Sequence, residues 1–403
     1  MSNQKKIMLL GGLRYLLPVI EEAHRMGVYV ITADYLPDNI AHKYSDEYVN
    51  VSIVDKDAVL KVAQEKQIDG ILSFAVDPGV VTAAYVAEQM GLPFQCSYQA
   101  ATILQNKVRF RTLLRDNDFH CPWFKGYSSV EQVLADQDSL PYPVIVKPAD
   151  SAGSKGVTKV EDKRDLSQAA DFALQNSISG ECIVEKLLDT VGYQSSTDVF
   201  TVDGRLAYVC YSDQLFDRNA ANPYTPAVEI WPSTMDKTHQ DDMSMQLQRL
   251  VSLLGMTTGI YNVEARVCSD GKAYIMEVSP RGGGNRIAEL QDRATSQHLI
   301  RAEIQKALSL PLETITQPVF DGVWCNYILH VYKEGHFAGM KIDNRFRAEH
   351  VMDEALTVAA GDKVHPFTGA NTSLGTLFLR FDTRKHLEAS LLQMDQHVNI
   401  ELQ

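Results

Sequence analysis

Residues 260–286 read IYNVEARVCSDGKAYIMEVSPRGGGNR. Two runs rich in β-branched and aromatic residues flank Asp270-Gly271. This dipeptide favours a type I′ hairpin turn, because both central residues of that turn need a positive φ. A two-residue loop then places Glu264 directly opposite Glu277. The stretch therefore predicts an antiparallel hairpin that carries two facing carboxylates.

Alternate residues of a strand point to opposite faces of the sheet, so each face of this hairpin has its own character. One face is expected to join the core: Val263, Ala265, Val267, Tyr274, Met276 and Val278. The other carries Asn262, Glu264, Arg266, Ile275, Glu277 and Ser279. Two carboxylates directly across a strand pair repel each other. We therefore expect a divalent cation with oxygen ligands between them, or neutralisation by Arg266 or Arg281 without metal.

The segment Ser279-Pro-Arg-Gly-Gly-Gly-Asn-Arg286 ends the second strand and leads into a helical pattern. Glycines before a helix leave backbone N–H groups free to meet an anion. Arg281 and Arg286 flank these glycines. Carboxylates followed by an anion cradle indicate metal–phosphate chemistry, whereas the alternative is a plain glycine-rich turn.

Composition limits the class of protein. With 403 residues the chain is long enough for two or three domains, and its formal net charge of −13 argues against a nucleic-acid or anionic-membrane surface. The six cysteines are scattered without a CxxC pair, which is typical of a reducing compartment, so a cytoplasmic location is expected. The apolar run at the N-terminus is too short for a signal peptide, and no run approaches transmembrane length.

Strands and helices alternate over residues 5–90, which predicts a parallel, doubly wound sheet. Ligands of such sheets lie at the carboxyl ends of the strands, which nominates Gly11, Gly12, Asp34 and Asp77. A dinucleotide site is not indicated, because GxGxxG is missing. Capping or turn formation is the favoured alternative for the two aspartates.

A strand over 142–148 ends in Lys147, and the loop 149–156 carries Lys155 at its tip before a second strand. It is not a Walker A loop, because it leads into a strand and not a helix. We interpret it as a hairpin flap whose N–H groups and Lys155 close over phosphates, or as a solvent-exposed hairpin tip. The strand over 182–188 offers its backbone to a purine edge, or is only a core strand.

Two further segments have less specific interpretations. Residues 98–118 are predicted to be helical, with a solvated basic face formed by Lys107, Arg109, Arg111 and Arg115. Residues 213–234 are predicted to be a long polar loop with three prolines.

In chain order, these features resemble the ATP-grasp superfamily over residues 5–310. The resemblance implies α/β and α+β organisation. The architecture has three lobes and an N-terminal, doubly wound parallel sheet (the pre-ATP-grasp domain), with nucleotide held between two β-rich lobes. The expected division is 1–118 (pre-ATP-grasp domain), 119–190 (small lobe with the phosphate flap), 191–318 (large lobe with the metal hairpin) and 319–403 (C-terminal α+β lobe).

The same resemblance implies ATP and Mg²⁺ as cofactors, with Mn²⁺ as an alternative cation. It assigns the metal to Glu264, Glu277 and Ser279, the last standing where the family has asparagine and expected to act through water. The nucleotide would be held by Lys107, Lys147, Ser151, Gly153, Ser154, Lys155, Gly156, Glu185, Lys186, Leu187, Leu188 and Gln194. The substrate carboxylate would be bound by Arg281, Gly283, Gly284 and Arg286.

Within the superfamily the chain looks most like L-amino acid ligases and carbamoyl phosphate synthetase-like proteins. This implies an ATP-dependent carboxylate–amine ligase that forms an amide through an acyl phosphate and releases ADP and phosphate. Its partners would be a small carboxylate, an amine and, as a family expectation, a second copy of the chain, with no nucleic acid and no membrane. One alternative is an enzyme that phosphorylates carbamate or bicarbonate. The other is a nucleotide-binding regulatory protein with decayed catalysis, which Ser279 and Gln194 favour.

Overall fold

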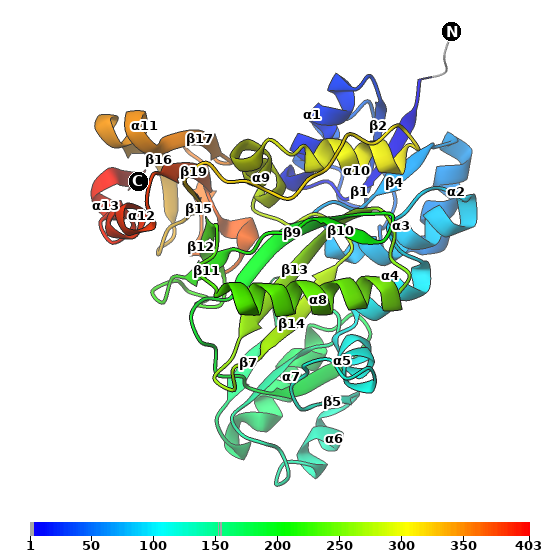
Figure 1. The fold of residues 1–403 in the computed structure, drawn as a ribbon, viewed down its shortest axis with the longest axis vertical. Helices are drawn as coiled ribbons and strands as arrows, with labels where there is room; N and C mark the ends of the chain where they lie inside the picture. Colours follow the sequence, from blue (N-terminus) through cyan, green and yellow to red (C-terminus); the bar gives the residue numbers. More distant parts are fainter. Residues whose placement is uncertain (1–3, 152, 154) are drawn as a thin grey trace.

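The computed structural model describes residues 4–151, 153 and 155–403. The strands of these residues form five sheets. In Figure 1 three arms extend from a central sheet. The N-terminal part lies at the upper right, the C-terminal part at the upper left, and a third arm, coloured teal, lies below. The mixed α/β and α+β organisation expected from the sequence is confirmed. No helix among the described residues combines the length and the apolar character needed to cross a bilayer.

The N-terminal part is a parallel sheet of order β3-β2-β1-β4, as predicted. Its strands are β1 (Lys6–Leu10), β2 (Tyr29–Asp34), β3 (Glu47–Asn50) and β4 (Gly70–Leu72), and its helices are α1 (Leu17–Arg25), α2 (Lys56–Lys66) and α3 (Asp77–Met90). The residues of β1 from Ile7 to Leu10 have no exposed surface, because helices cover both faces of a parallel sheet. Short 3₁₀ turns η1 (Arg14–Leu16) and η2 (Ile40–Lys43) follow β1 and β2.

The lower arm in Figure 1 is an antiparallel sheet of order β5-β8-β6-β7. It contains β5 (Phe124–Tyr127), α6 (Val130–Ala135), β6 (Val144–Pro148), β7 (Thr158–Val160), η3 (Lys163–Asp165), α7 (Leu166–Gln175) and β8 (Cys182–Lys186). Two helices precede it, α4 (Tyr98–Gln105) and α5 (Lys107–Asp116). They split at Asn106, whose extended backbone stops α4 and whose side chain accepts a hydrogen bond from Arg109 N–H at 3.0 Å.

The central sheet has the order β10-β9-β13-β14. It consists of β9 (Ser195–Val202), β10 (Arg205–Tyr208), β13 (Gly259–Val267) and β14 (Ala273–Ser279). Helix α8 (Lys237–Leu253) lies across one face, where Leu247 and Leu250 pack with Val263 and Ala265. The helices α9 (Ile287–Thr295) and α10 (Leu299–Ala307) follow the hairpin and pack against the N-terminal part.

The predicted hairpin is β13–β14, and Glu264 does pair with Glu277, as Asn262 does with Ser279. The predicted two-residue loop is wrong. Cys268 N–H donates to the carbonyl oxygen of Lys272 at 3.0 Å, so three residues form the loop, with Gly271 at φ 75°. A bulge offsets this extra residue, because beyond Glu264 the pairing shifts to Ala265 with Ile275.

The bulge also changes which side chains of β14 face the core. Ile275 is buried in the core with Ala265, whereas Tyr274 and Met276 form a separate cluster with Cys268. Tyr274 and Met276 are buried, as predicted, but not with Val263 and Ala265, so the predicted faces of Tyr274, Ile275 and Met276 are wrong. One additional residue reverses the alternation of every side chain beyond it.

The C-terminal part adds a five-stranded sheet of order β11-β12-β15-β19-β17 and a three-stranded sheet of order β18-β16-β20. Its elements are β11 (Asp213–Phe216), β12 (Pro226–Trp231), β15 (Val323–Leu329), β16 (Gly335–Ile342), α11 (Asn344–His350), β17 (Val351–Leu356), β18 (Lys363–Val364), η4 (Ala370–Thr372), β19 (Gly375–Phe381), α12 (Arg384–Leu391), α13 (Met394–His397) and β20 (Val398–Leu402). The prediction of a loop over 213–234 is wrong. Two of its parts are strands, because β12 pairs with β15 and buries Ile230 and Trp231.

Candidate active site

Glu264 and Glu277 lie directly opposite each other on β13 and β14. Burial and the facing charge of Glu277 raise the pKa of Glu264 to about 7. Lys107 Nζ lies 3.6 Å from Glu277 Oε2. The pKa of Glu264 stays high although Lys107, Lys147 and Arg266 act to lower it. Burial and repulsion therefore outweigh these cations, and a further cation would relieve the pair.

The two carboxylates fit a magnesium ion whose other ligands are water and phosphate oxygens rather than protein groups. Among the described residues no group of three or more His, Cys, Asp or Glu side chains assembles a metal site. Mg²⁺ is commonly held by one or two carboxylates and completes its shell with water and phosphate oxygens. The donor set therefore suits a magnesium–nucleotide complex better than an ion enclosed by protein alone.

Buried cations surround the carboxylate pair. Lys147 Nζ, on β6, lies 2.5 Å from Glu185 Oε1, and Arg111 Nε, on α5, lies 3.1 Å from Glu185 Oε2. Burial raises the pKa of Glu185, but the charges of Lys147 and Arg111 outweigh it and hold that pKa at about 2. Burial also lowers the pKa of Lys147. The Glu185 side chain thus orients Lys147.

The prediction of a solvated basic face on residues 98–118 is wrong for Arg111. Its side chain is fully buried, and Nη1 donates to the carbonyl oxygen of Met276 at 2.9 Å. This buried guanidinium connects α5 to β14. Its partner Glu185 lies 74 positions away, which explains why helix periodicity alone placed Arg111 in solvent.

The flap carries the predicted phosphate contacts. Lys107 Nζ donates to the carbonyl oxygen of Ser151 at 2.9 Å, so the first lysine touches the start of the flap. Gly153 and Gly156 have φ of 69° and 72°, and Lys155 between them is exposed. Ser154 lies outside the described residues. At its base the flap is anchored by Asp150, which accepts hydrogen bonds from the N–H groups of Ile178 and Ser179 at 2.9 and 2.6 Å.

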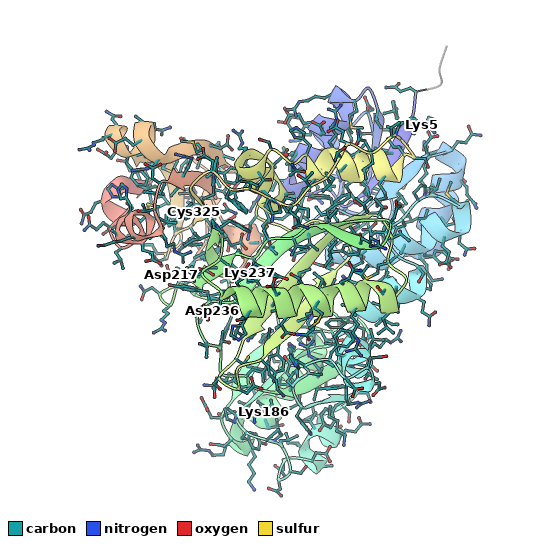
Figure 2. All side chains as sticks on the ribbon, in the orientation of Figure 1. Lys5, Lys186, Asp217, Asp236, Lys237 and Cys325 are labelled. Atoms are coloured by element: carbon teal, nitrogen blue, oxygen red, sulfur yellow. The ribbon has the colours of Figure 1, made fainter. Side chains whose placement is uncertain are left out.

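The predicted adenine-reading segment, residues 185–188, begins in the last two residues of β8 and continues beyond the strand. Lys186 N–H donates to the carbonyl oxygen of Trp123, and Leu187 N–H to that of Pro143, at 2.9 and 3.0 Å. Leu188 packs on the Tyr274–Met276 cluster. Figure 2 shows Lys186 in the lower arm, well away from Asp217 and Cys325 of the C-terminal part.

Gln194 directly precedes β9. Its Oε1 accepts from Arg266 Nη2 at 2.6 Å, and its Nε2 donates to Gln214 Oε1 at 2.9 Å. Arg266 therefore spans from the neighbourhood of Glu264 to Gln194. The structure brings Gln194 close to the charged groups of the site.

Ser279 and Arg281 both contact Asp77, the first residue of α3. Ser279 Oγ donates to Asp77 Oδ1 at 3.0 Å and accepts from Gln105 Nε2 at 2.6 Å. Arg281 binds both oxygens of Asp77, at 2.9 and 2.7 Å. Burial raises the pKa of Asp77, but Arg281 outweighs it and holds that pKa below its ordinary value. The strand-end position of Asp77 thus has a long-range partner, which local turn and capping patterns do not indicate.

The glycine segment also binds a carboxylate of the protein. Gly283 N–H lies 2.8 and 2.9 Å from the two oxygens of Asp198, on β9. Asp198 has no exposed surface and also accepts from Asn262 Nδ2 at 2.9 Å. Burial raises its pKa to about 6, although these hydrogen bonds act to lower it. The segment expected to bind a substrate anion therefore holds two protein anions, Asp77 at Arg281 and Asp198 at Gly283.

Arg286 is neutralised as well. It lies 2.9 Å from Glu289 Oε1 and 2.6 Å from Asp353 Oδ2. Gly284, next to Gly283, is open to space, since a Cβ atom there would meet nothing within 4 Å. Among the predicted substrate-binding residues, Gly284 thus has open space on the side where a Cβ atom would lie.

Sequence reasoning missed Asp198 and Glu229. Asp198 belongs to Ser195-Ser-Thr-Asp198, a polar run inside the buried strand β9. A polar run in a buried strand indicates that polar groups of other elements face it, and this was the signal available in the sequence. Glu229, on β12, accepts from Gln214 Nε2 at 3.1 Å. Burial, together with the charges of Asp198 and Glu264, raises its pKa to about 8, although the hydrogen bonds from Gln214 and Asn326 act to lower it. Its strand was predicted to be a loop, which hid its burial.

Comparisons with known proteins agree with this geometry. Residues 140–289 match the model of the ATP-grasp domain. The formate-dependent phosphoribosylglycinamide formyltransferase of Parasynechococcus marenigrum (strain WH8102) is 24% identical over 315 residues, which cover 77% of this chain and 79% of that protein.

Two solved structures share the fold over the whole chain. L-amino acid ligase from Bacillus licheniformis superimposes with a TM-score of 0.80 at 22% identity, covering 100% of both chains. The biotin carboxylase domain of Hydrogenobacter thermophilus 2-oxoglutarate carboxylase, a dimer solved with MgADP and bicarbonate, has a TM-score of 0.75 at 14% identity, covering 100% of this chain and 92% of that one. The chain thus contains a segment, residues 140–289, that matches the ATP-grasp domain, and it shares its fold with these ligase and carboxylase structures.

Proposed function

We propose that this chain is an ATP-dependent carboxylate–amine ligase. The observation that carries the proposal is the facing, partly buried Glu264–Glu277 pair, with Lys107 beside it and Lys147 close enough to act on the charge of Glu264. These charges suit a magnesium–triphosphate complex, which brings its own cation to the carboxylates and its own anions to the lysines.

The chemistry activates a poor electrophile. A carboxylate oxygen attacks the γ-phosphorus of ATP, ADP leaves, and an acyl phosphate forms. The amine nitrogen then attacks the acyl carbon, phosphate leaves, and the nitrogen loses a proton to give the amide. The protein mainly positions the reactants and neutralises developing charge.

The proposed roles follow the placement of the side chains. Glu264 and Glu277 would hold magnesium, which would neutralise phosphate charge, and Ser279 would contribute through water. Lys107, Lys147 and the flap at Ser151, Gly153, Ser154, Lys155 and Gly156 hold the phosphates. The 185–188 segment and Gln194 hold the adenosine. The substrate carboxylate and the acyl phosphate are bound by Arg281, Gly283, Gly284 and Arg286. For this to happen, Asp77 releases Arg281, and Asp198 releases the N–H group of Gly283.

Closure of the flap would protect the acyl phosphate from water. Gly153 and Gly156 supply the backbone freedom for that closure, since both occupy the left-handed region. Asp150 keeps the base of the flap in place through the 178–179 backbone.

The test is ADP release with pools of amino acids and other small carboxylates, with and without amines. Acceleration that needs both a carboxylate and an amine supports the ligase. Acceleration by bicarbonate alone instead identifies an enzyme that phosphorylates bicarbonate. Tight magnesium–ATP binding with no acceleration by any pool identifies a nucleotide-binding regulatory protein.

Mn²⁺ serves as an alternative to Mg²⁺ at the carboxylates, the chain forms a homodimer, and it works in the cytoplasm. The chain divides at residues 118, 190 and 318 into the pre-ATP-grasp domain, the small lobe, the large lobe and the C-terminal lobe. The scattered cysteines support the reducing compartment.

A further inference from the structure

A pocket of about 230 Å³ lies where three distant parts of the chain meet. Its wall comes from η1 and α1, from residues 283–289 that lead into α9, and from β17 and β19. Figure 1 shows α9 between the N-terminal part and β17. Gly283 borders the pocket, so the pocket adjoins the segment proposed to hold the reacting carboxylate. Its volume is below the roughly 300 Å³ of typical ligand sites, which suits a small metabolite.

Most of the wall is apolar, and its charged groups are few. The apolar side chains include Leu17, Pro18, Phe74, Ala288, Ile300 and Leu356. The charged ones are Arg14, Arg286, Glu21 and Glu289. An apolar wall with a few polar groups is the usual make-up of a small-molecule site, in which the polar groups orient the ligand.

The two arginines differ in their partners. Arg286 is paired with Glu289 and Asp353. Arg14 has neutral acceptors: its Nη2 donates to the carbonyl oxygen of Ala370 and to Ser373 Oγ, both at 2.6 Å. In the part of the chain that the structure describes, no carboxylate forms an ion pair with Arg14, since Glu21 instead pairs with Arg25.

Arg14 is therefore held in place while some N–H groups of its guanidinium have no hydrogen-bond acceptor among the described residues. Its hydrogen bonds to described residues all leave from Nη2, whereas a guanidinium carries five N–H groups. The two neutral tethers fix the position of the guanidinium without neutralising it. A fixed, uncompensated guanidinium at an apolar pocket favours an anion there.

We propose that Arg14 binds a second, non-reacting anionic group of the substrate, and that the apolar wall holds the short carbon skeleton between this group and the reacting end at Gly283. The proposal rests on the ligase function above and names its substrate class: a small amphiphile with one anionic terminus that stays unmodified. Carboxylate and phosphate termini share this chemistry, because a guanidinium binds both in bidentate fashion.

The experiment compares pairs of compounds that differ in that terminus alone. Butyrate is compared with glutarate as the carboxylate, and propylamine with 4-aminobutyrate and with 3-aminopropylphosphonate as the amine, each with a pool of the other reactant. ADP release by the wild type should show a KM about 10- to 100-fold lower for the anion-bearing members. The carboxylate and phosphonate arms show which terminus is preferred.

Arg14→Gln should abolish this preference. KM for the anion-bearing compounds rises about 10- to 100-fold, while kcat and the KM of butyrate and propylamine stay unchanged. Arg14→Lys keeps the charge and restores part of the preference, which a merely structural role would not explain. Arg164→Gln removes an exposed arginine that pairs with Asp162 and does not line the pocket, and it should leave the preference intact.

Failure of this inference is separable from failure of the ligase proposal. If no carboxylate and amine together accelerate ADP release, the ligase proposal fails. Calorimetric titration of glutarate and 3-aminopropylphosphonate into wild type and Arg14→Gln then tests the pocket alone. Binding that is lost in Arg14→Gln supports the pocket. Equal binding to both, or binding to neither, overturns it, as does a wild-type enzyme without preference for the anion-bearing compounds.

Discussion

Asp77 and Arg281 form a bidentate ion pair between the first turn of α3 and the end of β14, with N–O distances of 2.9 and 2.7 Å. The two residues are 204 positions apart. Ser279 donates to the same carboxylate, so the residue that departs from the family signature belongs to this contact. The pair joins the N-terminal part to the β13–β14 hairpin, and Arg281 changes partner if it binds a substrate.

Asp77→Asn is expected to destabilise the protein by about 3–5 kcal/mol, because it leaves a buried guanidinium without its counter-charge. The measurement is the free energy of unfolding from chemical denaturation at pH 7. Asp138→Asn breaks an exposed ion pair with Lys163 and is expected to cost less than about 1 kcal/mol. Equal costs for the two variants would mean that the Asp77–Arg281 pair does not hold the parts together.

Glu277→Gln is expected to lower turnover by about 10²- to 10³-fold and to leave the fold intact. Without magnesium the variant should be at least as stable as the wild type, because the repulsion that raises the pKa of Glu264 is removed. ADP release and thermal unfolding without metal measure the two effects. Glu161→Gln, at an exposed site beside β7, serves as the control. Unchanged turnover in Glu277→Gln contradicts the metal assignment.

Glu185 is expected to make stability depend on pH in the acid range. Its folded pKa is depressed from 4.5 to about 2, so its contribution is present above pH 4.5 and is lost as the pH falls toward 2. The full contribution is about 3 kcal/mol. Unfolding free energies between pH 5 and 3 should fall more steeply for the wild type than for Glu185→Gln. Parallel curves for the two proteins would falsify this role.

Gly282 and Gly284 provide a matched pair of substitutions within one segment. A Cβ atom on Gly282 would lie 2.3 Å from Phe74 Cζ, while one on Gly284 meets nothing within 4 Å. Gly282→Ala is therefore expected to cost about 1–3 kcal/mol by overpacking, and Gly284→Ala less than about 0.5 kcal/mol. Thermal unfolding of both variants measures the difference. Similar melting temperatures would show that Phe74 moves aside without cost.

Local patterns predicted the elements that are built from neighbouring residues. The alternation of strands and helices over residues 5–90 led to the parallel sheet, and Asp270-Gly271 led to the hairpin. The facing of Glu264 and Glu277 was predicted with a loop one residue too short. The bulge in β14 restored the register, so the prediction was correct for the pair and wrong for Tyr274, Ile275 and Met276.

The parts of the candidate site that lie within a single segment could be predicted from the residue types and spacing of that segment. The flap and Lys147 lie on one hairpin, and the two glutamates lie on another. The strands β11 and β12 were missed because prolines and polar residues obscured the alternation in a segment whose pairing partner, β15, lies about a hundred residues later. The burial of Glu229 depends on that pairing.

The sequence by itself determined the parallel sheet, the hairpin with its carboxylates and the resemblance to the ATP-grasp superfamily, since periodicity, turn chemistry and motif order all lie along the chain. Only the tertiary structure decided which charges meet. Asp77 at Arg281, Asp198 at Gly283 and Glu185 between Lys147 and Arg111 join separate elements. Such pairs depend on how buried surfaces dock, because burial strengthens a charge interaction between residues whose separation in sequence carries no signal.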